Sequence, residues 1–292
     1  MRMSVGILSA IHGPADVHAL DAAELPALCG EIRTTLVRYG HVHGGHIGSN
    51  LGMVEATVAL HRVFDSPRDR IVFDVSHQSY VHKMLTGRAD AYLDPAHHDS
   101  VTGFTNPAES AHDQFVLGHT GTSISLACGL AKSRDLTGGM DGGSGIRNVI
   151  AVIGDGSLSS AIAFEGLNNA AEQGGNLIII VNDNEMSISH NVGALSLFLS
   201  RNMERGWARR VRREVKDWLK SIPGIGDEMA EYAHRTHRSL KTVFTPGMLF
   251  EALRFNYIGP VNGHNIEEVE RHLRMAASID DQPVLLHGLT RK

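Results

Sequence analysis

Two polar triplets, each directly after a short apolar run, constrain the fold more than any other feature of the sequence. Val149–Ile153 leads into Gly154-Asp155-Gly156, and Leu177–Val181 leads into Asn182-Asp183-Asn184. Apolar runs of this length that end in Gly, Asp or Asn are typical of buried strands. A helical pattern over 160–173 connects them, which predicts a βαβ unit with parallel strands and a right-handed crossover.

The two triplets bring oxygen ligands to one edge of the predicted sheet. Parallel strands deliver the residues after their carboxyl ends to the same edge, where open α/β sheets bind ligands. The Asp155 carboxylate and the Asn184 amide oxygen suit Mg2+, which takes few protein ligands and completes its shell with phosphate oxygens. Glycines beside Asp155 let the backbone approach a diphosphate closely. The pattern predicts a metal-bound diphosphate site.

Each triplet taken alone is also compatible with a tight turn. Asp183 is ambiguous, because the side chain in the middle of such a triplet can point away from the others.

The rest of the chain alternates short apolar runs with amphipathic segments. This predicts an α/β fold, a parallel sheet with helices on both faces. We expect residues 1–292 to form a single domain, with a helical excursion rich in Arg, Lys and Glu at about 196–245. Locally we expect a helix over 20–38, an irregular Gly- and His-rich loop over 39–51, and a turn over 259–264.

Composition argues against several classes of function. The net charge of −5 gives no electrostatic basis for binding nucleic acid. No apolar run approaches the ~20 residues that span a bilayer, and residues 1–10 lack the apolar centre of a signal peptide. Two cysteines do not make a disulfide framework. We therefore expect a cytoplasmic protein with no nucleic-acid or membrane partner.

Two further segments place polar groups where a ligand could bind. Ser76-His77-Gln78 follows a predicted strand over 70–75, and Gly118–Ser123 opens a predicted helix. A Gly- and Thr-rich helix start presents free backbone N–H groups and the positive end of the helix dipole to anionic ligands. The chain has 18 histidines, and any one of them taken alone is also compatible with a surface or loop position.

Together with the triplets, which resemble the thiamine diphosphate motif, several segments resemble 1-deoxy-D-xylulose-5-phosphate synthase and, more distantly, transketolase. These segments are Gly45–Gly52, Asp74–Lys83, Gly118–Ser125, Asn182–Ser189, Asn191–Leu195 and Phe255–Val261. The resemblance runs from about residue 25 to the C-terminus and covers the N-terminal, diphosphate-binding domain of that family. It implies a thiamine diphosphate-binding fold of the transketolase N-terminal type, with thiamine diphosphate and Mg2+ as cofactors.

The resemblance also implies roles for individual residues at the metal end of the cofactor. Mg2+ would be bound by the side chains of Asp155 and Asn184 and by the backbone carbonyl of Met186. The backbone N–H groups of Gly156 and Ser157 would meet the diphosphate.

The same resemblance implies catalytic roles for two histidines. His77 would contact the diphosphate or lie beside it. His46 would face the substrate carbonyl and shuttle protons, which suits a near-neutral histidine at the alkoxide and enamine stages of thiamine chemistry. A purely structural position for His46 is the alternative. The remaining cofactor contacts would come from Gly118, His119 and Thr120 on the pyrimidine side, and from Met186 and Ile188, which would support the bent shape of the cofactor.

The implied activity is transfer of a two-carbon unit from pyruvate to an aldehyde, with small-molecule carbonyl substrates. Transfer of a ketol group by a split transketolase is the alternative, and a non-catalytic regulatory homologue is a second. The family's pyrimidine-binding domain, which supplies the activating glutamate, has no counterpart in residues 1–292. We therefore expect the diphosphate-binding subunit of a split enzyme, paired with a pyrimidine-binding-domain subunit in a heterotetramer; a truncated chain is the alternative.

Local departures from the family leave the donor and acceptor open. Pro107 lacks the basic residue that usually follows it, and Gly121 stands where the family tends to have Ser. Ser157-Leu158-Ser159 replaces a pattern of hydrophobic and small residues.

Overall fold

A parallel β-sheet forms the centre of the molecule. The computed structural model describes residues 6–139, 145–184 and 247–291. Within them, five strands lie in the order β1-β2-β3-β5-β4, with every neighbouring pair parallel. The strands are β1 (Arg70–Phe73), β2 (Val149–Gly154), β3 (Ile178–Asp183), β4 (Asn256–Asn262) and β5 (Val284–Leu289). The α/β prediction is confirmed.

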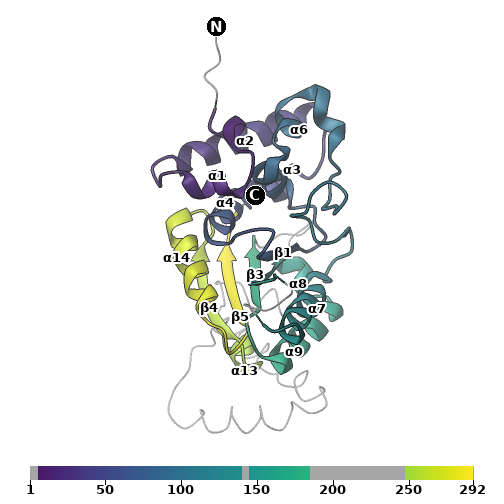
Figure 1. The fold of residues 1–292 in the computed structure, drawn as a ribbon, viewed down its shortest axis with the longest axis vertical. Coiled ribbons are helices and arrows are strands. Elements are labelled where there is room, and N and C mark those ends of the chain that lie inside the picture. Colours follow the sequence, from purple (N-terminus) through teal and green to yellow (C-terminus); the bar gives the residue numbers. More distant parts are fainter. Residues whose placement is uncertain (1–5, 140–144, 185–246, 292) are drawn as a thin grey trace, which may run out of the picture.

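Helices cover both faces of this sheet (Figure 1). One group packs on the face that carries Ile179, and the other packs on the face that carries Ile180. Because β2 and β3 are buried on both faces, their sequences read as unbroken apolar runs. The first group is α7 (Ser123–Leu136), α9 (Ala161–Gln173) and α13 (Gly247–Ala252); the second is α4 (Val54–Val63) and α14 (Ile266–Ala277).

A second core lies at the end of the sheet toward which the strands point (Figure 1). Its centre is α2 (Leu25–Val42), whose buried residues include Ile32 and Tyr39. The shorter helices around it are α1 (Pro14–Ala19), α3 (Ile47–Leu51), α5 (Tyr80–Lys83) and α6 (Asp90–Leu93). This layer positions the segments before α3 and α5 beyond the carboxyl end of β1.

The first long helix begins later than predicted. α2 starts at Leu25, because the residues before it form a turn in which the Asp21 N–H donates to the Glu24 carboxylate at 2.8 Å. Pro26 follows in the first helical turn, where the missing N–H of proline leaves no bond unmade.

The predicted irregular loop over 39–51 is wrong. α2 continues to Val42 because Tyr39 packs into the second core, and α3 begins at Ile47. The non-helical break is confined to 43–46, where Gly44 and Gly45 adopt φ of 85° and 109°. Those angles favour glycine.

The predicted turn over 259–264 is also wrong in its first half. β4 runs through Pro260 to Asn262, with a shift in its pairing to β5 between Ile258 and Val261. Proline is tolerated because β4 is at the edge of the sheet that the described residues form, where one row of backbone groups has no ladder partner.

Other elements match their predictions closely. α14 spans 266–277 as expected, and the Ser160 side chain caps α9 by accepting from the Ala163 N–H. The predicted excursion at about 196–245 lies outside the described residues. Across the ranges that the structure describes, no helix is both long and apolar enough to cross a membrane.

Candidate functional site

Two acidic side chains meet at the carboxyl ends of the central strands. Gly154 pairs with Asn182 in the register of β2 and β3, so Asp155 and Asp183 leave the sheet side by side. Asp155 opens the short helix α8 (Asp155–Leu158). Both side chains are buried, with residue exposures of 4% and 3%. They are joined by a side-chain hydrogen bond, and the Asp155 carboxyl also accepts from the backbone N–H groups of Gly156 and Asn184.

The electrostatics of the Asp155–Asp183 pair favour a bound cation. Burial raises the pKa of the Asp155 carboxyl to about 7, and the charge and hydrogen bond of Asp183 act in the same direction. A divalent cation would stabilise the charged form of the Asp155 carboxylate and offset its repulsion by the charge of Asp183.

The donor set suits a hard metal ion that also binds phosphate oxygens. No cluster of three or more His, Cys, Asp and Glu able to hold a metal occurs among the described residues. Amide, backbone or phosphate oxygens beside Asp155 would complete the shell of an ion here, and Mg2+ prefers oxygen ligands of this kind. Asn184, half-buried at the end of the described segment, stands next to the pair. The predicted ligand Met186 and the predicted contact Ile188 lie outside the described residues.

The structure shows where the Asp183 side chain points, which the sequence left open. Its Oδ2 lies 2.8 Å from Nε2 of His287 on β5, and His287 Nδ1 lies 2.8 Å from the Tyr257 hydroxyl on β4. His287 is fully buried. The sequence signal for this contact is a histidine inside the apolar run of β5.

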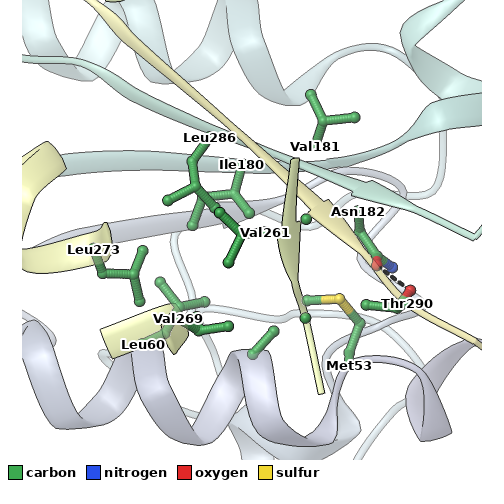
Figure 2. A pocket seen from close by; sticks show the side chains of 13 residues that line it. Met53, Leu60, Ile180, Val181, Asn182, Val261, Val269, Leu273, Leu286 and Thr290 are labelled. Atoms are coloured by element: carbon green, nitrogen blue, oxygen red, sulfur yellow. Dashed lines mark hydrogen bonds between the residues drawn. The ribbon is translucent and has the colours of Figure 1, made fainter. Parts of the chain in front are cut away.

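Asn182 lies on the opposite face of the sheet from Asp183. Its Oδ1 accepts a hydrogen bond from the Thr290 hydroxyl at 2.6 Å. Figure 2 shows this pair at the side of a small cavity, lined mainly by apolar residues such as Leu60 and Val261. The cavity volume of about 20 Å3 has room for about one water molecule and none for a cofactor. The Asn-Asp-Asn triplet is thus divided between two faces.

The start of α7 differs from its prediction. We expected its N–H groups to be free for an anionic ligand, but those of Gly121 and Ser123 donate to the buried Asp74 carboxylate at 2.9 and 3.0 Å. Asp74 follows β1 and therefore ties this helix start to the sheet. The preceding Gly118, His119 and Thr120 are exposed, and the backbone carbonyl of Thr120 lies 2.8 Å from His119 Nδ1.

The two histidines singled out from the sequence lie together. The ring centroids of His46 and His77 are 5.3 Å apart, and Phe104 packs 5.5 Å from the His46 ring. His77 follows β1 and Asp155 follows the neighbouring strand β2, so both lie at the same edge of the sheet.

Asn50, a residue to which the sequence assigned no role, holds the histidine segments in place. Its side-chain amide donates to the carbonyls of His46 and His77 at 2.7 and 2.8 Å, and its Oδ1 accepts from the Tyr80 N–H at 2.9 Å. The side chain is fully buried and uses both N–H donors and its amide oxygen to bind these backbone groups.

A strained turn connects β1 to His77. Val75 and Ser76 both adopt positive φ, 58° and 67°, which is unfavourable for residues other than glycine. Ser76 compensates through its hydroxyl, which donates to the Leu117 carbonyl at 3.2 Å and accepts from the Thr105 N–H at 3.1 Å. The turn is thereby fastened to the loop that passes over it.

Buried ion pairs also anchor the loop over residues 101–117. Arg88 contacts both oxygens of Asp113 at 2.7 and 2.9 Å, and Lys83 contacts Glu109 at 2.5 Å. Burial opposes the charged form of Asp113, but hydrogen bonds from His82 and Arg88 outweigh it and lower the pKa of the carboxyl well below its usual range. The loop over residues 101–117 is therefore anchored through charged groups as well as through apolar side chains such as Phe115 and Leu117.

Comparison with solved structures identifies the fold. A transketolase from Campylobacter jejuni superimposes with a TM-score of 0.64 and 18% sequence identity, over 93% of this chain and 38% of that one. A transketolase from Leishmania mexicana superimposes with a TM-score of 0.58 and 19% identity, over 90% of this chain and 35% of its own. At this identity the likeness establishes the fold, which is of the transketolase N-terminal type as predicted.

Sequence comparison identifies the particular family. The family model described as 1-deoxy-D-xylulose-5-phosphate synthase matches residues 8–290, and the chain belongs to this family. The 1-deoxy-D-xylulose-5-phosphate synthase of Lawsonia intracellularis is 58% identical over 286 residues, and that of Nitratidesulfovibrio vulgaris is 53% identical over 287. Each match covers 98% of this chain and 44% of the relative, so the chain spans less than half the length of these relatives.

Proposed function

We propose that this chain forms the diphosphate- and Mg2+-binding half of a thiamine diphosphate-dependent transferase that moves a two-carbon unit from pyruvate to an aldehyde. The observation that carries the proposal is the buried Asp155, placed beside Asp183 where two central parallel strands end. Membership of the 1-deoxy-D-xylulose-5-phosphate synthase family supports the choice of cofactor and reaction.

Each predicted contact has a defined part in this proposal. The side chains of Asp155 and Asn184, with the Met186 carbonyl, would hold Mg2+, and the backbone of Gly156 and Ser157 would meet the diphosphate. Gly118, His119 and Thr120 would face the pyrimidine side, where their exposure leaves them accessible. Ile188 would support the bent cofactor. When bound, thiamine diphosphate supplies a carbanion-like carbon that adds to a carbonyl group.

The chain's own contribution to the chemistry is proton movement and orientation. The exposed His46 ring can take a proton from, or return one to, a carbonyl oxygen of the substrate. His77, in ring contact with His46, would lie against the diphosphate, and Asn50 fixes the backbone of both. Phe104 packs edge-on against the His46 ring and would help to orient it.

The pyrimidine side of the site and the activating glutamate would come from outside residues 1–292. The relatives that share this sequence are more than twice as long, which supports a further domain in the working enzyme. We propose that a pyrimidine-binding-domain subunit supplies it, in a heterotetramer located in the cytoplasm. Co-purification of the two chains and the mass of their complex would test this arrangement.

Cofactor binding tests the proposal at its base. Calorimetric titration of the purified chain with thiamine diphosphate and Mg2+ should show one site, and Asp155→Ala should abolish it. Asp280→Asn, which neutralises an exposed carboxylate far along the sequence from the site, is the matched control and should bind as the wild type does. Equal binding by Asp155→Ala would contradict the proposed site.

Product analysis distinguishes the reaction from its alternatives. With the partner subunit, the cofactors, pyruvate and an aldehyde, the complex should release CO2 in proportion to product. A ketol transfer of the transketolase type uses a ketose donor and releases none. A non-catalytic homologue would leave the partner's activity unchanged when Asp155 is replaced by Ala.

A further inference from the structure

A row of polar side chains crosses the sheet and ends at the proposed metal site. Tyr257 stands on β4, His287 on β5 and Asp183 on β3, and these strands are consecutive neighbours in the sheet. The next strand is β2, whose end carries Asp155. The row therefore follows the strand order, one residue per strand, from the sheet edge to the carboxylate pair.

Strand register places the members of this row on one face. His287 pairs with Val181, and Asp183 is two positions further along β3, which returns its side chain to the same face. Tyr257 pairs with Leu285, two positions before His287, and so shares that face as well. The two 2.8 Å contacts then follow, Tyr257 hydroxyl to His287 Nδ1 and His287 Nε2 to Asp183 Oδ2.

The row occupies a face that is otherwise apolar. Val181 and Leu285, the sheet neighbours of His287 and Tyr257, are both fully buried, and His287 itself is 0% exposed. A buried histidine and carboxylate contribute little net stability compared with apolar residues of similar size. The Asp183 carboxylate also forms a hydrogen bond with Asp155, and this contact explains why His287 and Asp183 are placed here.

Hydrogen bonding fixes the roles of the two histidine nitrogens. An ionised Asp183 only accepts, so Nε2 carries the proton in that contact, and Nδ1 faces the tyrosine hydroxyl. The imidazole cannot flip without losing both contacts. Asp183 is thus held by one oxygen from the side opposite Asp155.

We propose that His287, oriented by Tyr257, is a positioning residue that holds the Asp183 carboxylate beside Asp155 and thereby sets the Mg2+ affinity of the site. The inference rests on the proposed function, because it assigns these residues to the same metal. Groups that orient the carboxylates around a metal typically change its affinity ten- to a hundredfold when they are removed.

The test compares metal affinity among variants that keep or remove the donor at position 287. Mn2+, which replaces Mg2+ and is detected by its paramagnetic resonance, is titrated into the purified chain with saturating thiamine diphosphate. His287→Leu removes the donor, and His287→Gln restores an N–H at the end of the side chain. His61→Gln is the matched control, because His61 is also fully buried but contacts His82 instead. Circular dichroism establishes that each variant is folded.

We expect about ten- to a hundredfold weaker Mn2+ binding for His287→Leu, affinity within about threefold of wild type for His287→Gln, and no change for His61→Gln. Tyr257→Phe removes a single oxygen atom and should weaken binding by a smaller factor, which provides the measurement if His287→Leu does not fold. If His287→Leu is folded and binds Mn2+ with wild-type affinity, the inference is wrong but the proposed function stands. If His287→Leu does not fold, wild-type affinity in Tyr257→Phe has the same meaning. Failure of the wild-type chain to bind thiamine diphosphate and Mn2+, both alone and with the pyrimidine-binding-domain partner, would overturn the proposed function with it.

Discussion

Asn50 is the residue whose replacement should most disturb the arrangement of the two histidines. Its fully buried side chain bonds to three backbone groups, the carbonyls of His46 and His77 and the N–H of Tyr80. The His46 carbonyl also accepts from the Ser49 hydroxyl and keeps that donor in a variant. The His77 carbonyl and the Tyr80 N–H each lose a buried hydrogen bond.

The expected loss of stability follows from those two groups. Depriving a buried polar group of its partner costs about 1–3 kcal/mol, and a truncated side chain leaves a small void besides. We expect Asn50→Ala to lower the free energy of unfolding by about 3–5 kcal/mol, by the same reasoning.

Urea denaturation monitored by circular dichroism measures this free energy. The matched control is Asn169→Ala, because Asn169 is exposed on α9 and bonds only to Gln173 among the contacts that the structure gives for it. Its variant should stay within about 0.5 kcal/mol of wild type, as surface substitutions usually do. If Asn50→Ala were as stable as Asn169→Ala, the conclusion that Asn50 holds the two histidine segments in place would be wrong.

Three further predictions address other parts of the molecule. Gly121→Ala should destabilise the chain by about 2 kcal/mol or more in thermal unfolding, because φ is 80° there and an added Cβ would come within 1.9 Å of Ser160 Oγ; an unchanged midpoint would contradict the geometry of the α7 start. Without metal, stability should fall as pH rises from about 4 to about 7, because the raised pKa of Asp155 favours its protonated form in the folded state. Mg2+ should therefore stabilise more at pH 8 than at pH 6, and Asp155→Asn should remove both effects. Cys29 and Cys128 should react slowly with a thiol reagent in the native chain, since burial raises the pKa of these thiols to about 12 and about 11; rapid reaction would show that they are accessible.

The sheet and the position of Asp155 could be predicted because their signals are local. An apolar run followed by Gly-Asp-Gly specifies a buried strand and its end within about ten residues, without knowledge of any distant contact. Strand order was not predictable in this way. β5 lies between β3 and β4 although it is last in the chain, and only packing of the whole sheet decides that order.

The missed contacts share one property, which is long separation along the chain. Asp183 and His287 are 104 residues apart, and Asp74 is 47 residues before Gly121. A pattern of residue types cannot show that a helix start already has an acidic partner, so the N–H groups of α7 read as free. The irregular loop was misjudged for a related reason, because packing of Tyr39 outweighs the low helix propensity of the adjacent Gly40.

Whether a metal ion sits against Asp155 is the most direct test of the proposed site. Crystals of the chain grown with thiamine diphosphate and Mn2+ would show the ion by its anomalous scattering. Our account predicts one strong peak within bonding distance of the Asp155 carboxylate and the Asn184 side-chain oxygen, with Asp183 still hydrogen-bonded to His287. A bound cofactor whose metal lies elsewhere, away from both residues, would contradict it.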